Sequence, residues 1–292
     1  MSKKRGKKKS LARRVLGTVG KYSWLGVKAA AKIGWTGAKT GAKLGFNGVK
    51  WLAGKSVEAA KNTNAKASRS KREAKFQALR EVETVSGSAT EFEEFLYENK
   101  STIGIIVGAR GSGKSVLGMR VLENAAARGR SVAAIGFDAS TLPNWIHSLK
   151  ANELDGVANG SFLLVDEGGI AFSSRDSMSS ANKLLSDLLF ISRHKDLSVL
   201  FVSQNSANIE VNALRQADYL LFKKPSLLQR DFERKRVNEL YDAAAAGFKK
   251  HSSEGKSLFY CYADAFVGFA ANGVPSFWSE RASKSFAKQK LG

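Results

Sequence analysis

Beyond residue 100, hydrophobic residues occur in short uninterrupted runs instead of alternating with polar ones. Runs of this kind, rich in Val, Ile, Leu and Phe, are typical of strands buried on both faces of a parallel sheet. We expect such strands at residues 103–107, 131–137, 161–165, 197–203 and 219–222. Two further runs, 258–262 and 266–269, predict a β-hairpin that turns at Asp264.

Between the runs, apolar residues recur at the spacing of one helix face. Leu184, Leu185, Leu188 and Leu189 show this most clearly, and basic residues follow at 193–195, where the helix dipole favours cations. Further helices are expected at 116–127, 142–149, 209–217 and 227–248, with two short helical stretches within 78–99. The alternation of strand and helix predicts an α/β fold, a mostly parallel sheet with helices on both faces.

A phosphate-binding loop lies between the first of these strands and the helix that follows it. Its residues match the pattern G-x-x-x-x-G-K-[ST] at every fixed position: Gly108, Ala109, Arg110, Gly111, Ser112, Gly113, Lys114 and Ser115. The glycines let backbone N–H groups point at phosphate oxygens, and the helix N-terminus favours anions. Lys114 is expected to contact the β- and γ-phosphates and the Ser115 hydroxyl to bind Mg²⁺, so the loop predicts a nucleotide site.

Two acidic residues, Asp166 and Glu167, follow the strand at 161–165. Because ligands of α/β sheets bind at the carboxyl ends of the strands, we expect both acids near the phosphate-binding loop. Asp166 would hold Mg²⁺ opposite Ser115, and Glu167 would polarise an attacking water. Paired acids favour hydrolysis by water over phosphoryl transfer to another substrate.

Further candidates follow from their position next to a strand. Gln204 ends the strand at 197–203, where an amide can contact the γ-phosphate or orient water. Arg193, Arg215 and Arg175 are candidates for an arginine that stabilises the transition state. Arg193 is the preferred one because it precedes the fourth strand.

Positive charge is concentrated at the start of the chain. Of 47 Lys and Arg and 26 Asp and Glu, residues 1–75 hold 21 basic and 2 acidic residues, which accounts for +19 of the net charge of +21. We therefore divide the chain into a basic extension, 1–75, and a nearly neutral domain, 76–292. The extension is expected to meet a polyanion, either nucleic acid or an anionic membrane surface.

Part of the extension repeats every 11 residues. Glycines recur at Gly26, Gly37 and Gly48, and on a helix the lysines of 28–50 would share one narrow sector flanked by aromatic residues. So many glycines make a helix unstable in water, so we expect it to form only against a partner. Three partners for residues 1–60 stay open: a membrane interface, nucleic acid, or another protein such as a capsid component.

The remaining composition narrows the compartment. One cysteine, Cys261, permits no internal disulfide, which suits a reducing environment. No apolar stretch approaches the roughly 20 residues of a membrane-spanning helix, and no cleavable signal peptide is apparent. We expect a protein that is not secreted, and that attaches to a membrane surface if the extension binds one.

The motifs together resemble the FtsK–HerA superfamily of P-loop ATPases. The resemblance rests on residues 108–115, the pair Asp166 and Glu167, residues 192–194 before an apolar strand, and Gln204 at the end of that strand. Within the superfamily the chain is similar to genome-packaging ATPases of tailless, membrane-containing icosahedral viruses, and its segment 274–280 resembles their C-terminal segment. The resemblance covers roughly residues 100–285 and does not include the basic extension.

The resemblance implies a P-loop NTPase fold of the RecA/FtsK type that uses ATP and Mg²⁺. It also implies a homo-oligomeric ring, a hexamer, that moves double-stranded DNA through its centre. Lys114, Glu167, Gln204 and Arg193 would be the catalytic residues, with Arg193 reaching the nucleotide of a neighbouring subunit. The alternative is an assembly or export ATPase that acts on protein at a membrane.

Overall fold

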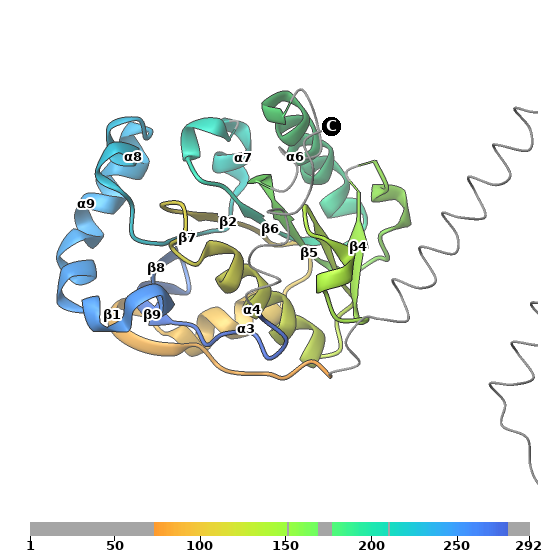
Figure 1. Cartoon of the computed structure of the whole chain (residues 1–292), viewed down its shortest axis with the longest axis horizontal. Coiled ribbons are helices and arrows are strands. Elements are labelled where there is room, and N and C mark those ends of the chain that lie inside the picture. Colours follow the sequence, from red (N-terminus) through yellow and green to blue (C-terminus); the bar gives the residue numbers. More distant parts are fainter. Residues whose placement is uncertain (1–72, 151, 169–176, 210, 280–292) are drawn as a thin grey trace, which may run out of the picture. The chain divides into compact units, whose positions relative to one another are not determined.

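The computed structural model describes residues 73–150, 152–168, 177–209 and 211–279, so the basic extension lies outside it up to residue 72. The described residues form one nine-stranded sheet in the order β1-β9-β8-β7-β2-β6-β5-β3-β4 (Figure 1). The α/β fold class is confirmed. The strands are β1 Arg80–Gly87, β2 Ile103–Val107, β3 Val132–Ile135, β4 Ile146–Leu149, β5 Phe162–Asp166, β6 Ser198–Val202, β7 Tyr219–Phe222, β8 Leu258–Ala263 and β9 Phe266–Ala271.

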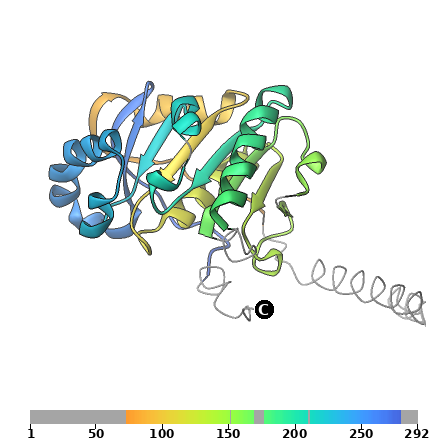
Figure 2. The same ribbon diagram turned by 90° about the horizontal axis from the view of Figure 1, so that it is seen from above.

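Six neighbouring strands, from β7 to β4, run parallel. Their apolar runs are buried because helices cover both faces: α3 (Ala89–Glu98) and α4 (Lys114–Ala127) on one, and α6 (Ser177–His194), α7 (Val211–Gln216) and α9 (Lys235–Lys250) on the other (Figures 1 and 2). Ile105 and Ile106 of β2 point to opposite faces and join separate hydrophobic clusters. Among the described helices, none has the length and apolar character needed to cross a membrane.

The predicted hairpin is confirmed, and it extends the same sheet. β8 pairs antiparallel with β7, and β9 pairs antiparallel with β8. The first of the two helical stretches expected within 78–99 was wrong, because 80–87 is the strand β1 on the open edge of β9. Three β-branched residues, Val82, Thr84 and Val85, favour a strand once that edge offers hydrogen bonds.

Two other predicted helices differ from the structure. Within 142–149, the chain forms β4, which pairs with β3 at the sheet edge. The helix expected over 227–248 is two helices, α8 (Leu227–Asp231) and α9. It breaks because Glu233 turns inward, where its carboxylate accepts hydrogen bonds from the backbone N–H of Ser206 at 3.1 and 3.2 Å. Arg234 is extended and is the N-cap residue of α9.

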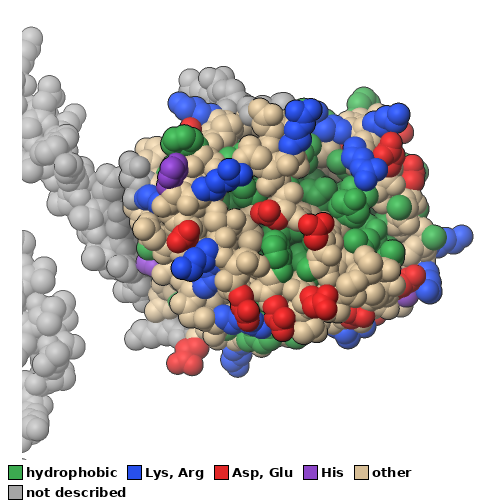
Figure 3. All heavy atoms as spheres, turned by 180° about the vertical axis from the view of Figure 1, so that it is seen from behind, with side chains coloured by type: hydrophobic (Ala, Val, Ile, Leu, Met, Phe, Trp, Pro, Cys, Tyr) green, Lys and Arg blue, Asp and Glu red, His purple; other side chains and the backbone are tan. Residues whose placement is uncertain are grey.

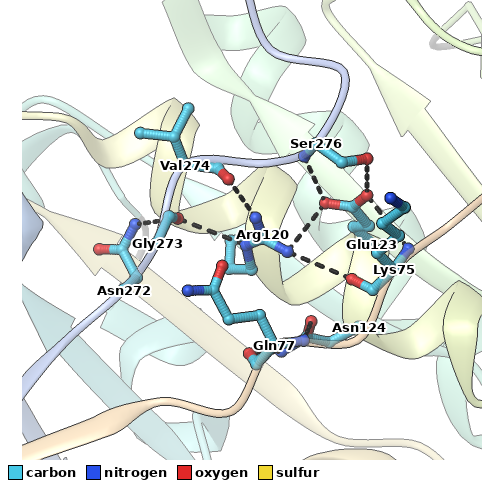
Figure 4. A network of polar contacts seen from close by, with 9 residues as sticks. All are labelled: Lys75, Gln77, Arg120, Glu123, Asn124, Asn272, Gly273, Val274 and Ser276. Atoms are coloured by element: carbon cyan, nitrogen blue, oxygen red, sulfur yellow. Dashed lines mark hydrogen bonds and ion pairs between the residues drawn. The ribbon is translucent and has the colours of Figure 1, made fainter.

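Three buried polar side chains on α4 bind the segment that leads into β1 (Figure 4). The Arg120 guanidinium lies 3.0 Å from the Glu123 carboxylate and donates to the backbone oxygen of Lys75 at 3.2 Å. Asn124 exchanges two hydrogen bonds with the backbone of Gln77, at 3.0 and 2.8 Å. The helix that follows the phosphate-binding loop therefore holds the start of the domain.

The same side chains bind the segment after β9 (Figure 4). Arg120 donates to the two backbone carbonyls of 273–274, and Glu123 accepts from the backbone N–H of Ser276 at 2.9 Å and from its hydroxyl. Phe277, the next residue, is buried. The segment expected to resemble the C-terminal part of packaging ATPases thus folds back onto α4.

Replacing Glu123 by Leu is expected to lower the free energy of unfolding by about 3 kcal/mol or more. The substitution leaves the Arg120 guanidinium buried without its carboxylate and removes the acceptor of Ser276. Urea denaturation measures the loss.

The matched control is Glu254→Gln, which breaks the exposed ion pair with Arg80 and should cost less than about 1 kcal/mol. Adding Arg120→Met to Glu123→Leu should restore part of the stability, because the unpaired charge is then gone. A Glu123→Leu loss no larger than that of the control contradicts the assignment.

Candidate nucleotide-binding site

The phosphate-binding loop joins the end of β2 to the start of α4 and packs on two other segments. A Cβ on Gly108, whose φ is +150°, would lie 2.6 Å from the Cβ of Lys223. A Cβ on Gly113, whose φ is +94°, would lie 3.0 Å from the backbone oxygen of Lys256. Both glycines are therefore required by backbone conformation and by close approach.

Lys114, the first residue of α4, is buried beneath this loop. Its ammonium donates to the backbone oxygens of Gly108 at 2.7 Å and Ala109 at 2.9 Å. Burial lowers the pKa of Lys114 to about 8, and the carboxylates of Asp166 and Glu167 oppose this shift. The charge is held inside the loop, where a phosphate can meet it at little cost in side-chain entropy.

Ser115 and Asp166 meet at this edge of the sheet. The Ser115 hydroxyl donates to Asp166 Oδ2 at 2.7 Å, and Asp166 Oδ1 accepts from the backbone N–H of Gly168 at 3.0 Å. Among the described residues no cluster of three or more His, Cys, Asp or Glu side chains could hold a metal. A hydroxyl and one carboxylate fit Mg²⁺, which takes few protein ligands and keeps waters and phosphate oxygens.

Glu167 is positioned by a residue that the sequence did not single out. Its carboxylate accepts a hydrogen bond from the Ser203 hydroxyl at the end of β6. β6 lies between β2, which leads into the loop, and β5, which leads into the acids. Gln204 comes just after β6 and therefore lies between the loop and the acids. The Gln204 side chain is exposed, and its Nε2 lies 3.8 Å from the position of a Cβ on Gly168.

A cavity of about 390 Å³ adjoins the outer side of the loop. Its wall is formed by loop residues 109–112, the connection between β7 and α8, the end of α9 and the start of β8. Phe248, Pro225 and Leu258 make it partly apolar, and the exposed Arg110 lies at its rim. The volume falls in the range of about 300–1,000 Å³ that is typical of ligand pockets.

Two features decide the fold family. A glycine-rich loop joins the strand β2 to the helix α4, and Asp166, at the end of β5, lies beside the start of that helix. The chain has the fold of a P-loop NTPase.

No protein-family model and no curated protein matches the chain. Among solved structures, it is similar to the DNA-packaging ATPase B204 from Sulfolobus turreted icosahedral virus, at 14% identity over 60% of this chain and 99% of that one, with a TM-score of 0.39. It is also similar to B204 from Sulfolobus turreted icosahedral virus 2 in complex with AMPPCP, at 14% identity over 60% of this chain and 100% of that one, with a TM-score of 0.40. A third similar structure is the pCW3 conjugation coupling protein TcpA, at 13% identity over 62% of each chain, with a TM-score of 0.40. At such identities the similarity concerns the fold alone.

In this P-loop NTPase fold, the loop lies where the parallel strands end, whereas Arg193 lies at the opposite edge of the sheet, where those strands begin. It is exposed near the end of α6, which leads into the amino end of β6, and the five residues of β6 separate the two edges by roughly 16 Å. Arg215, near the end of α7, lies at the same opposite edge, and Arg175 falls outside the described residues. Arg193 therefore does not reach the site of its own chain, and its role in a neighbouring site stays a prediction.

The opposite edge also carries a hollow of about 560 Å³, where hydrophobic side chains gather on the rear face (Figure 3). It lies between α7, β7 and the β8–β9 hairpin, and its charged lining residues are Asp218 and Asp264. Although this hollow is larger than the cavity beside the loop, apolar walls with carboxylates repel phosphate. The chemistry of the two cavities, and not their size, makes the loop the candidate nucleotide site.

Lys223 packs against the P-loop and binds the segment on which the loop rests, a role that the sequence did not reveal. It follows β7 and is almost fully buried, and its ammonium donates to the backbone oxygens of Lys256 at 2.8 Å, Ser257 at 3.1 Å and Leu258 at 3.2 Å, and to Asn272 Oδ1 at 3.0 Å. The backbone of Lys223 thus abuts the first glycine of the loop, and the Lys256 carbonyl that it holds abuts the last. A lysine at the end of an apolar run is ordinarily solvated, so only the tertiary contacts reveal it.

Lys223 should give the domain a distinct pH dependence of stability. Burial lowers its pKa from 10.5 to about 7, so between these values the unfolded chain binds a proton that the folded chain has released. Stability therefore rises with pH across this window, by up to about 1.4 kcal/mol per pH unit. Denaturation curves between pH 7 and 9 should show a larger gain for the wild type than for Lys223→Met.

Lys224→Met is the matched control, because Lys224 is the exposed neighbour. It should keep the wild-type slope of stability against pH. Equal slopes for the wild type and Lys223→Met would show that Lys223 does not titrate in this window.

Proposed function

We propose that this chain hydrolyses ATP and uses the energy to move double-stranded DNA, packaging a viral genome into a preformed capsid. The observation that carries the hydrolytic part is the convergence of three groups at one sheet edge: the buried Lys114 ammonium, the Ser115–Asp166 pair, and the Glu167 carboxylate. These are a cation for phosphate, oxygen ligands for Mg²⁺, and a base.

The residues divide the work of hydrolysis by position. The N–H groups of the loop and the Lys114 ammonium bind the phosphates and stabilise charge that develops on them. Mg²⁺, held by Ser115 and through waters by Asp166, would neutralise phosphate charge when bound. Glu167, oriented by the Ser203 hydroxyl, accepts a proton from the attacking water.

Gln204 is the group suited to sense the γ-phosphate, because β6 places it between the loop and the acids. The cavity beside residues 109–112 takes the nucleoside, with Phe248 and Leu258 against the base. Lys223 acts indirectly, by holding the segment that forms this wall.

The choice of DNA rests on charge and on the resemblance described above. Residues 1–75 carry +19 of the net charge of +21, which favours contact with a polyanion. A homo-oligomeric ring with Arg193 acting on the next subunit's nucleotide agrees with the position of Arg193 away from the site of its own chain. The proposed places of action are the host cytoplasm and the virion.

ATP turnover of the full-length protein, measured with and without double-stranded DNA, tests the proposal. Wild-type turnover should require Mg²⁺ and rise several-fold with DNA. Lys114→Ala should lose both nucleotide binding and turnover. Glu167→Gln should bind ATP as the wild type does and turn it over at least about 100-fold more slowly, because the base is removed.

Two outcomes would decide against the proposal. Turnover that ignores DNA but rises with a coat protein would favour the assembly or export ATPase. Wild-type turnover by Glu167→Gln would remove Glu167 from the mechanism.

A further inference from the structure

The short helix α8 presents an apolar surface to solvent. Leu227, Leu228 and Phe232 are 85%, 73% and 72% exposed. The helix is nevertheless firmly placed, since the Ser226 hydroxyl caps it, accepting from the Gln229 backbone N–H at 3.2 Å. Exposed apolar groups on an ordered element mark an interaction surface.

The polar side of α8 is attached to the nucleotide edge of its own chain. Gln229 Nε2 donates to the backbone oxygen of Gln204 at 2.7 Å, and Glu233 binds Ser206. The apolar side of the helix therefore faces away from the domain and cannot fold back onto it.

A groove of about 580 Å³ lies between α6 and α7 on the same helical layer. Leu189, Phe190, Arg193 and His194 line it from α6, and Asn212 and Gln216 from α7. Phe190 is 74% exposed, so the groove has an apolar wall with the Arg193 guanidinium beside it. α7 lies between α6 and α8 of the same chain (Figures 1 and 2).

We propose that α8 of one copy of this chain docks into the α6–α7 groove of a second copy. The two surfaces are complementary, since apolar side chains meet Phe190 and Leu189, and the exposed Asp231 carboxylate beside Phe232 meets the Arg193 guanidinium. Because they are different surfaces of one molecule, the contact is heterologous and repeats from copy to copy, which closes into a ring when the rotation permits.

The contact has a consequence for the nucleotide site, which rests on the function proposed above. Arg193 lines the groove, and the docked α8 is joined through Gln229 to Gln204 at the neighbour's nucleotide edge. Docking would bring Arg193 of one copy against α8 at the nucleotide edge of the next copy.

Two variants of the full-length chain separate the surfaces. The α8 variant, Leu228→Glu with Phe232→Glu, keeps an intact groove, and the groove variant, Phe190→Glu, keeps an intact α8. Light scattering with Mg²⁺ and an ATP analogue should show an oligomer for the wild type and a monomer for each variant alone. Mixed at equal concentration, the two variants should form a dimer and nothing larger, because only one junction is complete.

Val85→Glu, which changes an exposed apolar residue on β1, is the control and should assemble as the wild type does. A wild type that stays monomeric, a variant that still assembles alone, or a mixture that stays monomeric overturns the proposal.

ATP turnover of the mixture separates this inference from the proposed function. The dimer should gain turnover over either variant alone, and Arg193→Ala placed in the α8 variant, which supplies the groove, should remove the gain. If light scattering gives the predicted masses but the wild type does not turn over ATP, the proposed function is wrong and the docking proposal is still supported. If the wild type turns over ATP but the mixture of the two variants stays monomeric, the docking proposal alone is wrong.

Discussion

The register of three neighbouring parallel strands, β2, β6 and β5, decides which side chains meet at the nucleotide edge. Ile106 pairs with Val202, and Val202 pairs with Asp166, so all three strands end at the same height. Ser115 and Asp166 therefore come within 2.7 Å although 51 residues separate them in the chain. A shift of one residue in either pairing would turn the acids toward the other face of the sheet.

The burial of two lysine side chains is the cost of this arrangement, and backbone carbonyls offset it. Lys114 and Lys223 both lie almost out of solvent. Lys114 donates to main-chain oxygens of the loop itself, and Lys223 donates to main-chain oxygens of the segment at the start of β8. Around Lys114, the carbonyl partners satisfy the ammonium protons without cancelling the positive charge. Lys114 keeps its charge available to phosphate, and Lys223 fixes the segments against which the loop glycines pack.

Much of the fold and the centre of the site followed from the sequence because they depend on local patterns. Buried parallel strands leave uninterrupted apolar runs, and the phosphate-binding loop has fixed residues at fixed spacing. β1 and β4 were missed because edge strands owe their form to a partner distant in sequence. The break before Lys235 depends on Glu233 turning toward Ser206, and the roles of Ser203 and Lys223 depend on contacts over more than 30 residues.

The most direct test of the site is how nucleotide affinity depends on Mg²⁺, measured by calorimetry with a non-hydrolysable ATP analogue. Ser115 and Asp166 are assigned to the ion and Lys114 to the phosphates. Mg²⁺ should therefore raise wild-type affinity, and Asp166→Asn should lose at least about tenfold of that gain while its affinity without Mg²⁺ stays at the wild-type value. An Asp166→Asn variant that keeps the full gain from Mg²⁺ would contradict the account.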